Sequence, residues 1–210
     1  MLASASPRRT ALIGLLGLAW SAVPADVDED SFLLADPLLS ALNIALAKAR
    51  RIGDVDALVV AADTIVVSDG LTLAKPGDAA AAQRMLAGLR GRAHDVVSGV
   101  VVRSADGREW AGVVGTRVIM RAYSDAEIAG YTARGEPFDK AGGYAIQDAE
   151  FRPVERVDGC YLNVVGLPLC AVAGGVQALG IELPHAPSDT RPPCGYCQAG
   201  APLVVIEPAQ

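Results

Sequence analysis

The sequence predicts an α/β fold. Apolar runs rich in β-branched residues, typical of strands, alternate along the chain with segments whose apolar residues recur at helical spacing. We expect strands at 58–67, 95–102, 112–120 and 159–165, and helices at 7–16, 37–51, 79–89 and 125–134. Hydrophobic residues make up 51% of the 210 residues and aromatic residues only 5%, so the core should consist mainly of Ala, Val, Leu and Ile.

Local signals mark where each helix begins. Ser6 precedes a proline, and this order suits a helix start, since serine caps a helix and proline is favoured at its first position. Asp36 and Asp78 mark the next two starts. The fourth helix opens with a capping box, in which Ser124 and Glu127 each satisfy a backbone N–H of the other.

Two of these helices have an apolar face that we expect to pack on the core. In the first helix, which Gly17 should end, this face consists of Leu12, Ile13, Leu15, Leu16 and Ala19. In the second helix it consists of Leu39, Leu42, Ala45, Leu46 and Ala49.

The turn before the first helix has two interpretations. As a strand-to-helix turn, it would combine the hydroxyls of Ser4 and Ser6 with two guanidinium groups, an arrangement that binds phosphate. As an export signal, the arginine pair Arg8 and Arg9 would precede an apolar run with small residues near Ala25. We favour the phosphate-binding turn, because the run has helical spacing, contains glycine and is shorter than the roughly 20 residues that cross a bilayer.

The strand at 58–67 carries the most informative polar residues. Its apolar run LVVAADTIVV contains one carboxylate, Asp63, followed by the hydroxyl of Thr64. A carboxylate inside a strand is costly to bury without a partner, so we expect a functional role and a cationic neighbour. Lys48, on the second helix, and Lys75 are the candidates, although either lysine taken alone is typical of a solvated surface charge.

Two further segments are open to a structural or a functional interpretation. The acidic residues Asp26, Asp28, Glu29 and Asp30 suit a solvated loop, but carboxylate oxygens also bind the magnesium of a polyphosphate. The segment 136–147 (EPFDKAGGYAIQ) is either a simple loop with a positive φ at one of its paired glycines or a loop that approaches a ligand closely.

The composition argues against several classes of protein. A net charge of −6 disfavours broad binding to nucleic acids, and no segment is a candidate membrane span. The four cysteines are few for a chain of 210 residues and do not suggest a disulfide framework, so we expect a cytoplasmic protein.

We expect one domain over residues 1–183 and a proline-rich, partly irregular tail over 184–210. In the tail, Cys194 and Cys197 could bind zinc with further ligands, form a redox disulfide or have no role, and we favour no role. His94 should be a structural hydrogen-bonding residue, and neither it nor His185 is expected to be catalytic.

Taken in order, the motifs SASPRR, DVDED, AADTIVV, KPGD, GRAHDVVSGV, GEPFDKAGGYAIQ and VVGLPL resemble the Maf family of nucleotide pyrophosphatases, from Leu2 to about Leu183. The resemblance implies a mixed twisted sheet in two lobes around a central cleft, related to inosine triphosphate pyrophosphatases. It also implies a homodimer that hydrolyses nucleoside triphosphates to the monophosphate and pyrophosphate with Mg²⁺ or Mn²⁺.

The resemblance assigns roles to residues already noted. Asp63 would take the proton of the attacking water and, with Glu29, hold the metal ion. The lysines would stabilise the leaving pyrophosphate: Lys48, Lys75 and Lys140. The residues of the first turn would bind the phosphates: Ser4, Ser6, Arg8 and Arg9.

The resemblance also narrows the substrate. Arg8, Thr64 and Gln147 match the subgroup that acts on dTTP and UTP, and the same pocket could also accept modified pyrimidine nucleotides. A glutamine amide can donate and accept hydrogen bonds at the edge of a pyrimidine. The alternative is a nucleotide-binding regulator of cell division or stress with little turnover.

Overall fold

The structure is a computed structural model that describes residues 1–184 and the backbone of 204–205. Most of the expected tail, with His185, Cys194 and Cys197, lies outside the described residues. The helices are α1 (Pro7–Ile13), α2 (Pro37–Arg51), α3 (Ala79–Leu89), α4 (Asp125–Ala133), α5 (Tyr161–Val165) and α6 (Leu169–Ala178), with 3-10 turns η1 (Gly14–Leu16), η2 (Glu29–Phe32) and η3 (Ala141–Gly143). The strands are β1 (Val59–Ser68), β2 (Leu71–Leu73), β3 (Ala93–Arg103), β4 (Glu109–Met120), β5 (Val154–Asp158) and β6 (Val204–Val205).

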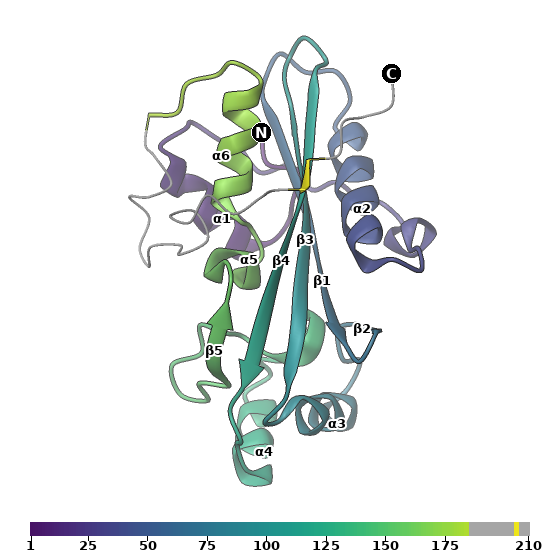
Figure 1. Ribbon diagram of the computed structural model, residues 1–210, viewed down its shortest axis with the longest axis vertical. Coiled ribbons are helices and arrows are strands. Elements are labelled where there is room, and N and C mark those ends of the chain that lie inside the picture. Colours follow the sequence, from purple (N-terminus) through teal and green to yellow (C-terminus); the bar gives the residue numbers. More distant parts are fainter. Residues whose placement is uncertain (185–203, 206–210) are drawn as a thin grey trace. The chain divides into compact units, whose positions relative to one another are not determined.

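A single sheet organises the described part of the chain. Its strand order is β2-β1-β3-β4-β5, and β6 pairs with β4 off this path. The pairs β1–β2 and β4–β5 are antiparallel, whereas Leu2 forms isolated parallel bridges to Val60 and Ala22. The described part of the chain contains both helices and strands (Figure 1), so the predicted α/β class is confirmed.

The chain divides into two compact units. The first unit contains Met1–Thr64, Val97–Gly115 and the described residues from Gly159 onward. The second unit contains Ile65–Val96 and Thr116–Asp158. Strands β1, β3 and β4 therefore contribute residues to both units.

The helix starts agree with the sequence prediction because they depend on local chemistry. The Ser6 hydroxyl accepts a hydrogen bond from the backbone N–H of Arg9, and Asp36 and Asp78 cap α2 and α3 in the same way. Both hydrogen bonds of the capping box between Ser124 and Glu127 are present in α4. Gly17 ends the first helical segment in the left-handed conformation, with φ 68°.

In the first unit, helices cover both faces of the strands (Figure 1). The backbone of α2 lies directly against Gly99 of β3, where only a glycine leaves enough room. On the other face, Gly175 of α6 packs against Trp110 of β4 and Val102 of β3. Because α2 is held this closely, its inward side chains reach the neighbouring strand β1.

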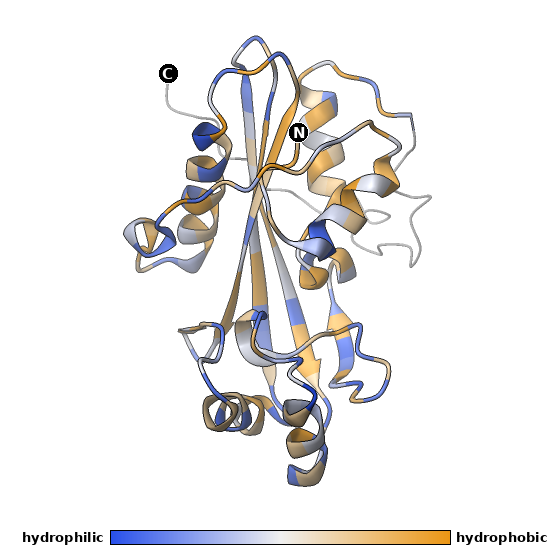
Figure 2. Ribbon diagram, turned by 180° about the vertical axis from the view of Figure 1, so that it is seen from behind, coloured by the Kyte–Doolittle hydropathy of each residue, from blue (hydrophilic) through white to orange (hydrophobic). Residues whose placement is uncertain are grey.

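Hydrophobic residues follow the strands and α6, while α2 carries hydrophilic residues on its outer surface (Figure 2). The core consists mainly of aliphatic side chains, as predicted, with fully buried examples in Leu2, Val59, Val100, Leu167 and Val176. Within the described residues, we find no helix with the length and apolar character needed to cross a membrane.

One predicted strand is wrong. Residues 159–165 are one of the predicted strands, but they contain the short helix α5. Gly159 and Gly166 flank this helix with φ of 135° and 124°, and the amide of Gly166 bonds to the carbonyl of Leu162. The strand of this region precedes it, at β5.

The apolar faces of the first two helices differ from the prediction in part. Leu15 and Leu39 are 44% and 41% exposed, Ala19 is also exposed, and Leu46 is half-buried. In α2, Ser40 is buried instead of Leu39, because its hydroxyl exchanges hydrogen bonds with the backbone of Leu34 in the preceding loop. The buried face of α2 is therefore rotated toward Ser40, Ala41, Ile44 and Lys48.

Candidate active site

Strand β1 carries a carboxylate and a hydroxyl as neighbours within the core of the first unit. Asp63 is only 7% exposed, and Thr64 follows it in the strand. Successive side chains of a strand point to opposite faces, so these residues have different partners. Asp63 contacts α2, whereas Thr64 contacts Arg9 of α1 and Ser98 of β3.

The centre of the site is Lys48, whose ammonium group lies between two carboxylates. Its Nζ is 2.7 Å from Oδ1 of Asp63 and 2.6 Å from Oε1 of Glu29. The side chains of Lys48 and Asp63 are each 9% exposed, whereas that of Glu29 is 51% exposed. Of the two lysines that the sequence offered as partners of Asp63, the structure pairs it with Lys48.

Each element of this group has a structural reason for its place. Lys48 belongs to the buried face of α2, which Gly99 allows to approach the sheet. Glu29 opens the 3-10 turn η2, and η2 packs against α2. The acidic segment that sequence reasoning left between two interpretations therefore supplies a carboxylate to the buried ion pair.

The two carboxylates are a suitable donor set for a divalent cation. Oxygen ligands from one or two carboxylates, completed by phosphate oxygens of a substrate, are typical for Mg²⁺. Within the described residues, no group of three or more His, Cys, Asp or Glu side chains forms a complete metal site. The positive charges of Lys48 and Arg9 oppose the two negative charges of Glu29 and Asp63, so a divalent cation here would depend on the additional oxygen ligands of an anionic substrate.

The serines of the first turn form local hydrogen bonds. The Ser4 hydroxyl accepts from the backbone N–H of Ser6 at 3.1 Å, and the Ser6 hydroxyl accepts from that of Arg9 at 3.4 Å. Each hydroxyl keeps its own hydrogen for donation to another group. Ser4 is buried and Ser6 is half-buried, and Leu2 holds this segment beside β1.

Arg9 is fixed inside the first unit. Its Nε donates to the carbonyl oxygen of Gly166 at 2.8 Å, and its Nη2 donates to Oγ1 of Thr64 at 3.1 Å. Burial lowers the pKa of its guanidinium, and the charges of Asp63 and Glu29 act in the opposite direction. Arg9 thus brings a half-buried positive charge to the Asp63 region.

Ser98 is a member of the site that sequence reasoning missed. It is fully buried in β3, and its hydroxyl lies 2.8 Å from Oγ1 of Thr64. The Gly166 carbonyl, in the VVGLPL motif, also accepts hydrogen bonds from Arg9 and Thr64. The signal that identified Asp63, a polar residue within an apolar strand, also applies to the run VVSGVVV around Ser98.

Three predicted site residues belong to the second unit. Lys75 and Gln147 are exposed, and Lys140 forms ion pairs with Glu136 and Asp139. The contacts of the described residues therefore form two groups, one of Glu29, Lys48 and Asp63 and one of Arg9, Thr64 and Ser98. The roles of Lys75, Lys140 and Gln147, which belong to the other unit, stay predictions.

The same unit contains His94, whose expected structural role agrees with its contacts. His94 is buried, and its Nε2 lies 2.7 Å from the hydroxyl of Tyr144. Burial, with a smaller contribution from the charge of Arg117, lowers the pKa of the imidazole to about 4. The segment after Lys140 has the positive φ that its glycines suggested, 76° at Gly142 and 69° at Gly143.

Comparisons with known proteins agree with one another. Residues 1–179 match the family model described as Maf-like protein. A dTTP/UTP pyrophosphatase of Thermomicrobium roseum is 44% identical over 204 residues, which cover 94% of this chain and 92% of the relative. Proteins of the same name from Syntrophotalea carbinolica and Anaeromyxobacter dehalogenans are 43% and 47% identical, over 93% and 88% of this chain and 90% and 95% of their own lengths.

Proposed function

The chain belongs to the Maf family, and from this premise we propose that it is a dTTP/UTP pyrophosphatase that releases pyrophosphate from these nucleotides at the site around Asp63. Identities of 43–47% over most of the chain to relatives of that name support the activity. The observation that carries the assignment to a site is the buried ammonium of Lys48 between the carboxylates of Asp63 and Glu29. We assign the activity to a domain over residues 1–183 with an inosine triphosphate pyrophosphatase-like fold.

In this proposal, Asp63 accepts a proton from the water that attacks the α-phosphorus. A general base must be held in a fixed position, and its pair with Lys48 does so at a buried location. As the water loses its proton to Asp63, its oxygen bonds to phosphorus and the bond to the leaving pyrophosphate breaks. Lys48, Lys75 and Lys140 stabilise the charge of that pyrophosphate.

The carboxylates of Glu29 and Asp63 would hold Mg²⁺ or Mn²⁺ together with phosphate oxygens of the nucleotide. A bound ion of this kind supplies Lewis-acid stabilisation of the triphosphate charge. The half-exposed position of Glu29 supports its role, since a metal ion arriving with the nucleotide must be reached from solvent.

The hydroxyls of Ser4 and Ser6 and the guanidinium groups of Arg8 and Arg9 bind the phosphates in this proposal. Arg8 and Arg9 are both half-buried. Arg9 donates hydrogen bonds to Gly166 and Thr64, so it contributes mainly a charge held in a fixed position. Both carry a permanent positive charge suited to phosphate oxygens.

We assign recognition of the pyrimidine to Gln147, with Arg8 and Thr64 as further determinants. The exposed Gln147 amide can donate and accept at the base edge. The hydroxyl of Thr64 is engaged by Arg9 and Ser98, which supports an effect of Thr64 on specificity that acts through Arg9. We include modified pyrimidine nucleotides among the proposed substrates of the same site. We also propose that the enzyme is a cytoplasmic homodimer.

The test is pyrophosphate release with Mg²⁺ or Mn²⁺ across a panel of canonical and modified nucleoside triphosphates. We expect selectivity for dTTP and UTP, and a loss of at least about 10²-fold in kcat for Asp63→Asn. Asp95→Asn is the matched control, because Asp95 is an exposed carboxylate of β3 that pairs with Arg117. Selectivity for purines would contradict the assignment of the substrate, and binding without release would favour the regulator.

A further inference from the structure

The contacts on either side of Gln147 point to a positioning device for base recognition. We propose that Arg134 and Asp148 form a clasp that fixes the Gln147 segment to α4 and thereby sets the preference for dTTP and UTP. This inference rests on the proposed role of Gln147 and deepens it, because it names the residues that hold the glutamine in place.

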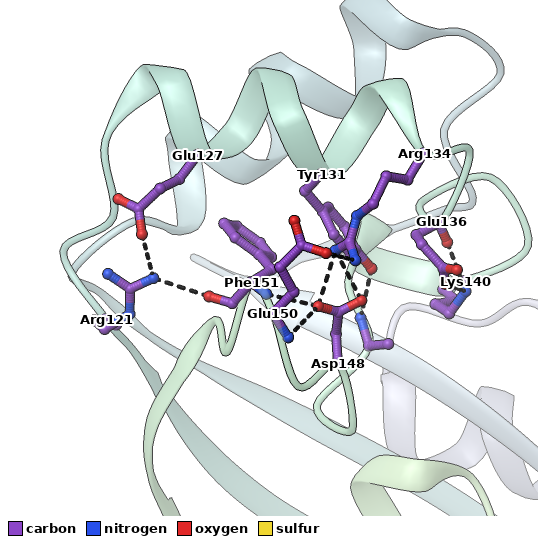
Figure 3. Close-up of polar contacts among 10 residues, drawn as sticks. Arg121, Glu127, Tyr131, Arg134, Glu136, Lys140, Asp148, Glu150 and Phe151 are labelled. Carbon is purple, nitrogen blue, oxygen red and sulfur yellow. Dashed lines mark hydrogen bonds and ion pairs between the residues drawn. The ribbon is translucent and has the colours of Figure 1, made fainter.

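Asp148, the residue after Gln147, is the centre of the clasp (Figure 3). Both of its carboxylate oxygens lie 2.9 Å from Nη2 of Arg134, at the end of α4. Oδ1 also accepts from the backbone N–H groups of Glu150 and Phe151, at 3.1 and 2.6 Å. One side chain thus ties the helix to the turn that follows Gln147.

A second anchor lies before Gln147. The backbone N–H of Ala145 donates to the hydroxyl of Tyr131 at 2.9 Å, and the ring of Tyr131 stacks on Phe151 with centroids 4.4 Å apart. Arg134 lies over the same tyrosine ring, 5.3 Å from its centroid. Tyr131 and Arg134 are three residues apart, so one face of the helix holds the segment on both sides of Gln147.

The carboxylate of Asp148 is largely shielded from water, while Arg134 and Gln147 are exposed. The side chain of Asp148 is 9% exposed and that of Arg134 is 32% exposed. Burial would raise the pKa of the Asp148 carboxyl, but hydrogen bonds from Arg134 and Phe151 outweigh it and hold the pKa below its usual value. Gln147, between the two anchors, is exposed and makes no hydrogen bond within the described part of the chain.

This arrangement separates holding from recognition. A glutamine discriminates well between bases only if its amide is held in position. A mobile side chain must be ordered on binding, and the entropy cost of this ordering reduces the free energy gained from each contact with the base. The segment from Ala145 to Phe151 gains its order from α4 and leaves the Gln147 amide available. The clasp therefore affects selectivity more than the chemical step.

The test compares kcat and KM for dTTP and dCTP in matched variants of the full chain. Asp148→Asn and Arg134→Met should lower the preference for dTTP by about tenfold, mainly through a higher KM for dTTP. Arg134→Lys should restore part of it, because the lysine keeps the charge. Glu150→Gln is the control, because Glu150 is the second carboxylate that pairs with Arg134 and its side chain is 76% exposed. This change should leave the preference for dTTP unchanged.

A double-mutant cycle distinguishes positioning from a general structural role. In a Gln147→Ala background, Arg134→Met should cause no further loss of preference, since the glutamine that it positions is absent. Equal losses for dTTP and dCTP, or independent losses from the two changes, would overturn the proposal.

Hydrogen–deuterium exchange gives a readout that does not depend on the substrate. The backbone amides of residues 145–151 should exchange faster in Asp148→Asn than in the parent. Their exchange rates should be unchanged in Glu150→Gln. Unchanged exchange in Asp148→Asn would overturn the clasp itself. A different outcome is also informative: the amides exchange faster in Asp148→Asn, but the unaltered enzyme prefers dCTP. That result would confirm the clasp and contradict the proposed role of Gln147, and with it the link between the clasp and selectivity.

Discussion

Lys48 and Asp63 form a buried ion pair in which Nζ lies 2.7 Å from Oδ1 and both side chains are 9% exposed. Glu29, at 2.6 Å from the same Nζ, adds a second carboxylate that is half open to solvent. A buried pair contributes little net stability, because desolvation of both charges offsets their attraction. Its value lies in fixing the carboxylate that we assign to proton transfer.

Removal of the lysine alone should therefore be more harmful than removal of both charges. Lys48→Met leaves the buried Asp63 without its ion-pair partner, and we expect it to lower the free energy of unfolding by about 3–5 kcal/mol. The double variant Lys48→Met/Asp63→Asn should recover much of this stability while activity stays lost. Urea unfolding and pyrophosphate release measure the two effects.

The control is Arg156→Met in β5. Arg156 pairs with Asp158 at 2.9 Å, and their side chains are 67% and 45% exposed. A loss of under about 1 kcal/mol is expected for such a surface pair. If Lys48→Met cost no more than Arg156→Met, the pair with Asp63 would not be the buried interaction described above.

Ser98→Ala should weaken nucleotide binding although Ser98 was not among the predicted site residues. Its hydroxyl is bonded to Thr64, which receives a hydrogen bond from Arg9. The alanine removes this support and should cost about 1 kcal/mol of stability. We expect KM for dTTP to rise several-fold, and steady-state kinetics would measure it.

Thr132→Val is a suitable control for this prediction. Thr132 is a buried hydroxyl that donates to the carbonyl of Ile128 at 2.8 Å within α4. If Thr132→Val loses a similar amount of stability but leaves KM unchanged, the rise in KM of Ser98→Ala does not come from lost stability alone. The rise would then be assigned to the weakened support of Arg9 through Thr64. Equal changes in KM for both variants would remove that assignment.

Sequence reasoning was most successful where structure depends on neighbours in the chain. The starts of α1, α2, α3 and α4 follow from caps that lie within three residues of the groups they bond. The sequence also identified Asp63 as unusual, since a carboxylate interrupts an apolar strand.

Contacts between distant segments could not be predicted in this way. Nothing local distinguished Lys48 from Lys75 as the partner of Asp63, because the choice depends on the packing of α2 against β1. Ser98 and Thr64 are 34 residues apart and meet only when β1 and β3 share a sheet. The helix α5 was mistaken for a strand, because β-branched residues favour strands while the flanking glycines decide the outcome.

The buried imidazole of His94 predicts that the protein is less stable in mild acid. Its folded pKa is about 4, below the ordinary value of 6.5. The unfolded chain therefore binds a proton that the folded chain does not, so stability is full above about pH 6.5 and falls as the pH drops toward 4. The loss is of the order of 3 kcal/mol at most.

Chemical unfolding between pH 7.5 and 4.5 measures this loss. His94→Gln should flatten the profile, because its amide does not titrate. Tyr144→Phe should retain the acid dependence, since burial rather than the hydrogen bond to Tyr144 is the main cause of the lowered pKa. A His94→Gln profile parallel to that of the parent would assign the acid loss to carboxyl groups instead.

Gly99→Ala should alter the site indirectly, by displacing α2 from the sheet. A Cβ at this position would lie closer than 3.0 Å to backbone atoms of Ala41 and Leu42, and backbone cannot move aside as a flexible side chain can. We expect a loss of about 3 kcal/mol in the free energy of unfolding. Because α2 also carries Lys48, its displacement from the sheet should lower kcat more than Ser98→Ala does.

Gly115→Ala in β4 is the matched control, since no atom lies within 4 Å of the Cβ that this change adds. It should leave stability and kcat close to those of the parent. Full activity of Gly99→Ala with lowered stability would show that the pair of Lys48 and Asp63 tolerates movement of the helix.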